Sequence, residues 1–355
     1  MSKYWSPITR NVKPYIPGEQ PQDKEYIKLN TNENPYPPAP EVVEAIKKEA
    51  DEKLRLYPDP ACQKLREAIA DYYNLNQEQV FVGNGSDEVL AFSFMTFFNS
   101  EVSGEFILFP DITYSFYPVY AGLYRINYHT VALNDDFSLP VEKYIRDNGG
   151  IIFPNPNAPT GKYLPLAKVE EIIQKNQEQV VIVDEAYIDF GGESAVKLIK
   201  DHPNLLVIQT FSKSRSLAGM RVGFALGQEH LITGIERIKN SFNSYTIDRV
   251  ALAAATAAIG AREYYQKTTE KILNTREYIS RELRKLNFNV IDSSTNFVFA
   301  SPPGKKAEFL FQKLKEVGIL VRYFDHPRIN NYLRISIGTD EEMDIFLGKV
   351  KKLIN

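Results

Sequence analysis

The sequence has few cysteines, few histidines and no surplus of charge of either sign. Cys62 is the only cysteine, which excludes an intrachain disulfide framework and favours a reducing compartment. The four histidines are scattered, none pairs with another at a spacing typical of metal ligands, and we expect no metal site. With 42 basic and 45 acidic residues the net charge is −3, which disfavours nucleic acid and anionic membranes as partners.

Long hydrophobic runs are also missing. The longest apolar tract, Val250–Ile259, is rich in alanine and too short to span a bilayer. Residues 1–10 contain no apolar segment like the core of a signal peptide, so we expect a cytoplasmic protein. At roughly 150 residues per domain, a chain of 355 residues is long enough for about two domains with a cleft between them.

Between residues 80 and 208 the chain alternates short apolar segments with stretches long enough to form helices. This pattern predicts an α/β fold: a large domain with a mostly parallel central sheet flanked by helices. The predicted strands are Val80–Val82, Phe106–Phe109, Ile151–Phe153, Val180–Val183 and Leu205–Ile208.

The composition changes along the chain in a way that predicts four parts. Residues 1–40 are rich in Pro, Asn and Tyr, which favours an extended N-terminal arm. Residues 41–245 would form the large domain, and residues 246–286, almost free of Gly and Pro, read as one long connecting helix. Residues 287–355 predict a smaller C-terminal α/β domain, with strands near 288–291, 296–300, 319–324 and 332–337 and helices near 306–317 and 341–353.

Ligands of open α/β sheets bind beyond the carboxyl ends of the strands, so the residues there are candidates for a site. The run from Gly83 to Glu88 follows the first strand and precedes an apolar helix, where backbone N–H groups could hold an anion such as phosphate; a plain tight turn would look the same. Tyr114 follows the second strand and could stack on a planar ligand or belong to the core. The loop of residues 154–161 carries the amide of Asn157, and ordinary turn chemistry explains it equally well.

Two further strand ends carry charge. Asp184 lies at the tip of an apolar strand, where burial is costly without a cationic partner, and Tyr187 follows it. Lys213, beside Ser212 and eight residues before Arg221, has the chemistry of an imine-forming lysine next to a phosphate clamp, or of a basic surface turn. Pyridoxal phosphate needs such a set of groups: a lysine, an acid at the ring nitrogen and anchors for the phosphate.

Taken together, these segments resemble the fold-type I pyridoxal-phosphate-dependent aminotransferases over nearly the whole chain. The segments that carry the resemblance are Lys13–Gly18, Leu29–Pro35, Arg55–Pro60, Asp184–Tyr187, Ser212–Arg221, Asn240–Tyr245, Gly318–Tyr323 and Leu333–Ser336.

The resemblance implies pyridoxal 5'-phosphate as the cofactor and a role for each matching residue. Lys213 would form the imine with the cofactor and move the proton of the substrate Cα. Asp184 would pair with the ring nitrogen, and Tyr187 would bond the phenolic oxygen of the ring and tune the imine. Tyr114 would stack on the ring. The phosphate would be held by Gly85, Ser86, Asp87, Ser212 and Arg221.

The resemblance also implies how substrates and a second subunit take part. Arg334, with Arg322 near it, would hold the substrate carboxylate through a planar, two-pronged guanidinium, and Tyr15 in the arm would close over the substrate. Tyr57 would reach the cofactor phosphate of the neighbouring subunit, which makes the protein a homodimer with shared active sites.

One position departs from the family pattern. Ala158 stands where the family commonly has a second asparagine that bonds the phenolic oxygen, so either Asn157 takes over that bond or the bond is missing.

The resemblance further implies a reaction that interconverts imidazole-acetol phosphate plus glutamate with histidinol phosphate plus 2-oxoglutarate, a step of histidine biosynthesis. An aromatic amino-acid aminotransferase is the alternative, followed by a phosphothreonine decarboxylase. A non-enzymatic effector-binding domain of a transcription regulator is disfavoured, because such proteins carry an additional basic DNA-binding domain.

Overall fold

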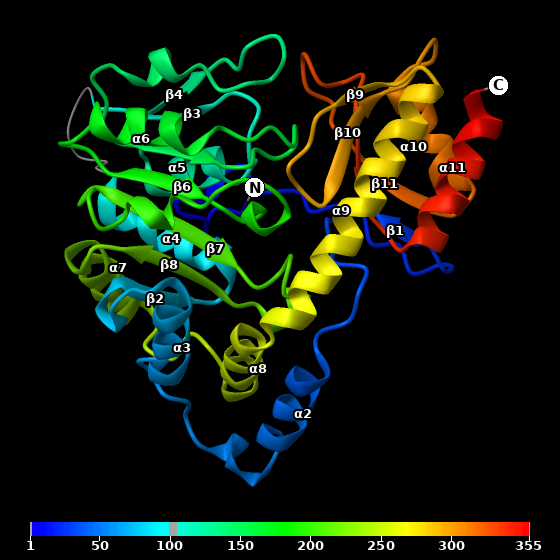
Figure 1. Ribbon diagram of the computed structural model, residues 1–355. Helices are drawn as coiled ribbons and strands as arrows, with labels where there is room; N and C mark the ends of the chain where they lie inside the picture. Colours follow the sequence, from blue (N-terminus) through cyan, green and yellow to red (C-terminus); the bar gives the residue numbers. More distant parts are fainter. Residues whose placement is uncertain (1, 99–104, 355) are drawn as a thin grey trace.

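The protein, described here from a computed structural model for residues 2–98 and 105–354, has two lobes, each built on its own sheet (Figure 1). The sheet of the larger lobe has the order β2-β8-β7-β6-β5-β3-β4. All neighbouring strands pair in parallel except β8, which lies antiparallel between β2 and β7, so the prediction of a mostly parallel sheet is confirmed. The strands are β2 (Val80–Gly83), β3 (Ile107–Pro110), β4 (Tyr128–Val131), β5 (Ile151–Pro154), β6 (Val181–Asp184), β7 (Leu205–Thr210) and β8 (Gly223–Gly227).

Helices cover both faces of this sheet, which is why its central strands β5, β6 and β7 are buried throughout and mostly apolar. One face packs against α2 (Pro40–Glu49), α3 (Gln63–Tyr73), α6 (Leu166–Gln174) and α8 (Arg249–Gly260). The other face packs against α4 (Gly85–Phe97), α5 (Tyr117–Tyr124) and α7 (Glu229–Phe242). Side chains alternate between the faces along β6: Val181 and Val183 belong to the first core, whereas Ile182 belongs to the second.

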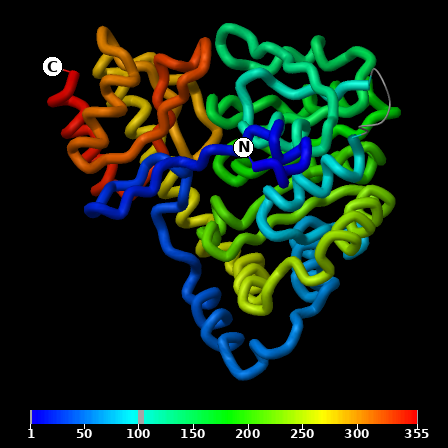
Figure 2. The backbone as a smooth tube through the Cα atoms, turned by 180° about the vertical axis from the view of Figure 1, so that it is seen from behind, coloured from blue at the N-terminus to red at the C-terminus, as the bar shows by residue number. Residues whose placement is uncertain are grey.

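The smaller lobe has a sheet of order β1-β11-β12-β10-β9. Its strands are β1 (Ile27–Leu29), β9 (Asn289–Ile291), β10 (Phe297–Ser301), β11 (Ile319–Tyr323) and β12 (Leu333–Ser336). Three helices pack on it: α9 (Arg262–Lys285), α10 (Ala307–Glu316) and α11 (Asp340–Ile354). Strand β1 comes from the N-terminal arm and pairs in parallel with β11, whereas the first residues of the arm lie over the larger lobe, where Tyr15 stacks on Phe116 (Figure 2).

Two expectations from the sequence were wrong in detail. The arm is not extended throughout, because it contains β1 and a short helix, α1 (Pro7–Asn11), whose first turn is capped by the Ser6 hydroxyl. The single helix expected over 246–286 is two helices, α8 and α9, separated by Ala261, which has non-helical backbone angles (φ −79°, ψ 44°). Helix α9 then runs from the larger to the smaller lobe, as Figure 1 shows. The boundaries of the four predicted parts stay predictions, and their end residues 1 and 355 lie outside the described residues.

The lobes also touch directly, through side chains other than those of α9. Arg328 of the smaller lobe pairs with Asp111 of the larger one at 2.9 Å and donates to the carbonyl of Leu133 at 2.8 Å. Short 3₁₀ helices complete the connections: η1 (Glu52–Arg55), η2 (Gln77–Gln79), η3 (Val141–Tyr144), η4 (Ile188–Phe190), η5 (Ala195–Leu198) and η6 (Ala218–Met220).

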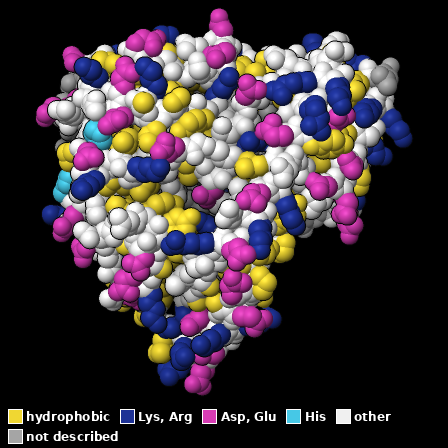
Figure 3. Space-filling model, in the orientation of Figure 1, with side chains coloured by type: hydrophobic (Ala, Val, Ile, Leu, Met, Phe, Trp, Pro, Cys, Tyr) yellow, Lys and Arg dark blue, Asp and Glu magenta, His cyan; other side chains and the backbone are white. Residues whose placement is uncertain are grey.

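Charges of both signs are interspersed on the face shown in Figure 3, in keeping with the near balance of the sequence. Within the described residues, the helices include none that is long and apolar enough to cross a membrane. The same part of the chain brings together no group of three or more side chains that could ligate a metal.

Candidate active site

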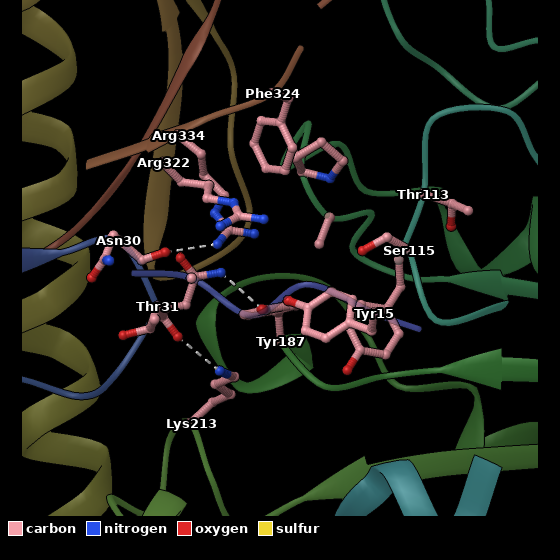
Figure 4. Close-up of a pocket in the computed structure, with 15 residues that line it drawn as sticks. Tyr15, Asn30, Thr31, Thr113, Ser115, Tyr187, Lys213, Arg322, Phe324 and Arg334 are labelled. Atoms are coloured by element: carbon pink, nitrogen blue, oxygen red, sulfur yellow. Dashed lines mark hydrogen bonds between the residues drawn. The ribbon is translucent and has the colours of Figure 1, made fainter. Parts of the chain in front are cut away.

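Two adjoining cavities lie between the lobes, at the carboxyl ends of the parallel strands. Thr31, Tyr114, Ala158, Tyr187 and Lys213 line both of them. The cavity toward the larger lobe adds most of the residues predicted to hold a cofactor, namely Ser86, Asp87, Asp184, Ser212 and Arg221. The cavity toward the smaller lobe adds the predicted substrate residues Tyr15, Arg322 and Arg334 (Figure 4).

The first turn of α4 forms one wall of the inner cavity. The first N–H groups of the helix have no hydrogen-bond partner within it, and they lie at the positive end of the helix dipole. This end of α4 can therefore bind an anion. Gly85 has φ +77°, and a Cβ there would lie 2.4 Å from Nη2 of Arg221, while a Cβ on Gly223 would lie 2.3 Å from the backbone N of Ser86. Only glycine allows the two loops to approach so closely.

The Arg221 guanidinium reaches this turn from the loop after β7. Its Nη2 lies 2.9 Å from Oδ2 of Asp87, and the other oxygen of that carboxylate accepts a 2.7 Å hydrogen bond from the Tyr114 hydroxyl. Ser212, on the same loop, is buried and accepts a hydrogen bond from the Thr210 hydroxyl. The result is a small polar cradle with one guanidinium, hydroxyls and backbone donors, which is the donor set a phosphate group requires.

Asp184 occupies the floor of the same cavity. Because it ends β6 on the face of Ile182, it points toward α5, where the Tyr117 hydroxyl donates to its Oδ2 at 2.8 Å. Burial raises the pKa of Asp184 to about 6, although the bonds from Tyr117 and the Ala186 N–H act in the opposite direction. Among the ion pairs of the described residues none involves Asp184, so this carboxylate suits a cationic ring nitrogen in the cavity.

The adjacent carboxylate, Glu185, points to the other face of the sheet. It accepts hydrogen bonds from Ser194, the Ala195 N–H and Gln209, and it lines neither cavity. Burial raises the pKa of Glu185 to about 7. The alternation of the strand therefore separates two neighbouring acids, one at the site and one in the core.

Lys213 lies between the two cavities. Its Nζ donates to the carbonyl of Thr31 at 3.3 Å and lies 5.7 Å from the centre of the Tyr187 ring. The Tyr187 hydroxyl in turn accepts a 2.8 Å hydrogen bond from Nδ2 of Asn32. Figure 4 shows Lys213, Thr31 and Tyr187 converging on one space.

Two arginines face the outer cavity from neighbouring strands. Arg322 and Arg334 are directly opposite each other in the β11–β12 ladder, an arrangement of like charges that costs stability. Nη2 of Arg334 donates to the carbonyl of Asn30 at 3.0 Å, and its buried Nε has no partner among the described residues. Burial lowers the pKa of Arg334, and the nearby charge of Arg322 lowers it further. Two converging cations with spare donors are suited to an anionic substrate group.

Three predicted residues do not line the cavities of the single chain in the way expected. Tyr57 is 79% exposed, stacks on Tyr245 with ring centres 4.5 Å apart, and lies away from the cavities. Ala158 lines both cavities, whereas the Asn157 amide donates to the Ile112 carbonyl and the Thr160 hydroxyl beneath the loop. Gly85 shapes the cradle without lining it.

The sequence reasoning missed Tyr117 and Asn32, as well as the carbonyls of Asn30 and Thr31. Asn32 lies inside the Leu29–Pro35 segment, which has three asparagines among seven residues and which gave only the family resemblance. Tyr117 gave no signal, because one more tyrosine near Tyr114 is unremarkable in a chain with 21.

The chain is similar to known proteins over its whole length. The family model described as aminotransferase class I and II matches residues 24–350. A protein of Clostridium botulinum strain Okra named histidinol-phosphate aminotransferase is 59% identical over 355 residues, covering 100% of this chain and 99% of the relative. A protein of Clostridium acetobutylicum with the same name is 57% identical over 354 residues, covering 100% of both chains.

Solved structures agree with this similarity. The crystal structure of histidinol-phosphate aminotransferase from Sinorhizobium meliloti, in complex with pyridoxal-5'-phosphate, superposes with a TM-score of 0.89 at 25% identity. The match covers 100% of this chain and 98% of that one.

Proposed function

Because the chain belongs to the family of class I and II aminotransferases, we propose that it exchanges an amino group between histidinol phosphate and 2-oxoglutarate. The relatives that support this substrate are 57% to 59% identical over the full chain and carry the name of that activity. The structural observation that carries the proposal is the pair Arg322 and Arg334, opposite each other at the outer cavity. Histidine biosynthesis would be the pathway.

Pyridoxal 5'-phosphate is the cofactor of this family, and when bound it supplies an electron sink for the substrate carbon. In our proposal the cradle of Ser86, Ser212 and Arg221 holds its phosphate, with Gly85 and Asp87 shaping the turn. Asp184 would pair with its ring nitrogen, since a buried carboxylate is stabilised by a cationic partner.

The remaining groups act on the substrate and on the ring. Lys213 would hold the cofactor covalently and carry the proton of the substrate Cα. Tyr114 would cover the ring, and Tyr187 would donate to its phenolic oxygen. Asn157 would also contact the cofactor, although its amide N–H groups already donate to the Ile112 carbonyl and the Thr160 hydroxyl.

The two arginines offer one binding place to two different anions. Histidinol phosphate carries a phosphate group where glutamate carries its α-carboxylate. Two guanidinium groups can neutralise the two negative charges of the phosphate, and each can also form a bidentate pair with a carboxylate. Tyr15, which lines the outer cavity and stacks on Phe116 with ring centres 4.4 Å apart, would cover the bound substrate.

We also propose a homodimer with shared active sites. Large side chains with apolar surface are exposed around Tyr57: Leu54 is 58% and Leu56 48% exposed, and Tyr245, which stacks on Tyr57, is 43% exposed. Such a patch is typical of an interface, and Tyr57 on it would reach the phosphate of the partner's cofactor. Sedimentation tests the dimer. Mixing inactive Tyr57→Ala and Lys213→Ala chains should restore part of the activity, because each mixed dimer then contains one intact site.

The single thiol, Cys62, is in keeping with a cytosolic location, which we include in the proposal. We likewise retain the four-part organisation as a proposal, with the arm at 1–40, the large domain at 41–245, the connector at 246–286 and the small domain at 287–355.

The deciding experiment compares amino donors side by side. Purified holoenzyme is assayed with histidinol phosphate, phenylalanine and tyrosine, each with 2-oxoglutarate, and with phosphothreonine for release of CO2. We expect the highest kcat/KM for histidinol phosphate. A preference for the aromatic acids would make the protein an aromatic aminotransferase, and CO2 release would make it a decarboxylase. Protein that never takes up pyridoxal phosphate would overturn the cofactor as well.

A further inference from the structure

Three consecutive residues, Asn30 to Asn32, contact three different functional groups of the site. The carbonyl of Asn30 accepts from Arg334, the carbonyl of Thr31 accepts from Lys213, and the side chain of Asn32 meets the Tyr187 hydroxyl (Figure 4). Asn32 is 1% exposed and has φ +55°, a left-handed conformation that asparagine tolerates better than most residues. The hydrogen bonds of the buried Asn32 side chain therefore hold it in one orientation.

The hydrogen bonds of Asn32 fix which way its amide faces. The Ser336 hydroxyl oxygen accepts a 2.9 Å bond from the backbone N–H of Asn32. Its one proton therefore remains for the Oδ1 of Asn32, also at 2.9 Å. With Oδ1 turned to Ser336, the NH₂ group faces Tyr187.

The same reasoning fixes the Tyr187 hydroxyl. Its oxygen accepts from Nδ2 of Asn32 at 2.8 Å, so its own proton must point away from Asn32. Tyr187 and Lys213 line both cavities, and the space left for that proton is the cavity itself. An aspartate at position 32 would present an acceptor to the Tyr187 hydroxyl, whose proton would then point toward residue 32 and away from the cavity.

We propose that Asn32 is a positioning residue that directs the Tyr187 O–H toward the phenolic oxygen of the bound cofactor. The inference rests on the proposed cofactor function and deepens it. Asn32 also links the lobes, because Ser336 lies on β12, two residues after Arg334, while Tyr187 belongs to the larger lobe. The orientation of a group at the cofactor is thus tied to the strand that carries the substrate arginine.

The test is a double-mutant cycle on the holoenzyme, read from the pH midpoint of its visible absorbance. Asn32→Gly removes the side chain and keeps the left-handed backbone without strain. A hydrogen bond donated to the phenolic oxygen stabilises the deprotonated form of the bound cofactor. Losing this hydrogen bond therefore raises the pH at the midpoint. We expect Asn32→Gly and Tyr187→Phe each to raise it by about one pH unit, a tenfold change in proton affinity. The double variant should show no more than the Tyr187→Phe shift.

The matched control is Asn204→Ala, which removes another buried asparagine side chain, bonded to the carbonyl of Asn176 and lining neither cavity. Its midpoint should equal that of the wild type. If Asn32→Gly does not fold, Asn32→Asp replaces it, since it keeps the acceptor for Ser336 and loses the donor; its upward shift should shrink when residue 187 is Phe.

An unshifted midpoint in the Asn32 variants, while Tyr187→Phe shifts it, overturns the inference and leaves the proposed function intact. A shift of Asn32→Gly that persists in full beside Tyr187→Phe overturns it as well. Wild-type protein with no visible absorbance after incubation with pyridoxal phosphate would instead reject the proposed function.

Discussion

The Tyr117 hydroxyl donates a 2.8 Å hydrogen bond to Oδ2 of Asp184, and both side chains are buried. This bond holds the carboxylate in place beneath the cavity. It also opposes the effect of burial, which raises the pKa of Asp184 to about 6. The carboxylate that we propose to pair with the cofactor thus depends on a neighbour that the sequence did not reveal.

Tyr117→Phe should therefore move the acidic limb of the kcat/KM profile to higher pH. Removing a donor to the charged form raises the pKa of Asp184, so the carboxylate ionises only at higher pH. A hydrogen bond to a charged group is worth about 1.5 kcal/mol, which corresponds to roughly one pH unit. An acidic limb at the wild-type position would show that Tyr117 does not act on Asp184.

Asp184→Asn should retain bound pyridoxal phosphate and lose kcat by roughly a thousandfold, since the amide keeps the shape and removes the charge that we propose to face the ring nitrogen. Glu185→Gln is the matched control, because Glu185 is equally buried but lines neither cavity. It should retain kcat within a few fold. Full activity in Asp184→Asn would remove this residue from the mechanism.

The burial of Glu185 leads to a separate prediction, about how the stability of the protein changes with pH. Its pKa is raised by burial from 4.5 to about 7, so the folded apoprotein binds this proton more tightly than the unfolded chain. The stability it contributes is fully present below pH 4.5 and is lost as the pH rises to about 7. Urea unfolding of the apoprotein should show a smaller decrease over this range in Glu185→Gln than in the wild type. Equal decreases would contradict the assignment.

Gly85→Ala should weaken the binding of pyridoxal phosphate by about tenfold or more. The new methyl group would displace the Arg221 guanidinium, 2.4 Å from the Cβ position, and a left-handed Ala costs about 1 kcal/mol. Gly219→Ala is the control, because a Cβ there meets nothing within 4 Å. Titration of the apoprotein followed by absorbance measures both. Unchanged affinity in Gly85→Ala would exclude this cradle as the phosphate site.

Arg334→Lys should lower kcat/KM for both histidinol phosphate and glutamate by about a hundredfold, or about 2.8 kcal/mol, because an ammonium cannot form the two-pronged contact. The control is Arg284→Lys. Arg284 lies on α9 and forms an exposed ion pair with Asp292, so this variant should leave kcat/KM unchanged for both substrates. If only one of the two substrates is affected, the arginine does not serve both anions.

Much of the fold was predictable because its signals are local. The strands β2, β3, β5, β6 and β7 and the helices α10 and α11 were predicted to within a residue or two, since apolar runs and helical periodicity lie in the sequence itself. The strand β8 was missed because it begins and ends in glycine, and β4 because it is an exposed edge strand. The break at Ala261 was missed because alanine carries no signal for it.

The sequence by itself determined which chemical groups follow which strand: Lys213, Asp184, Arg221 and the turn at Ser86. These groups meet because β2, β6 and β7 run in the same direction, so their carboxyl ends reach the same edge of the sheet, where the antiparallel β8 begins. The tertiary structure decided the partners. Tyr117 meets Asp184 when α5 packs on the large sheet, and Arg322 faces Arg334 when β11 pairs with β12. Asn32 meets both Tyr187 and Ser336 only once the arm lies between the two lobes. Asn32 and Ser336 are 304 positions apart, and no local propensity encodes a contact that only the docking of the arm against two lobes creates.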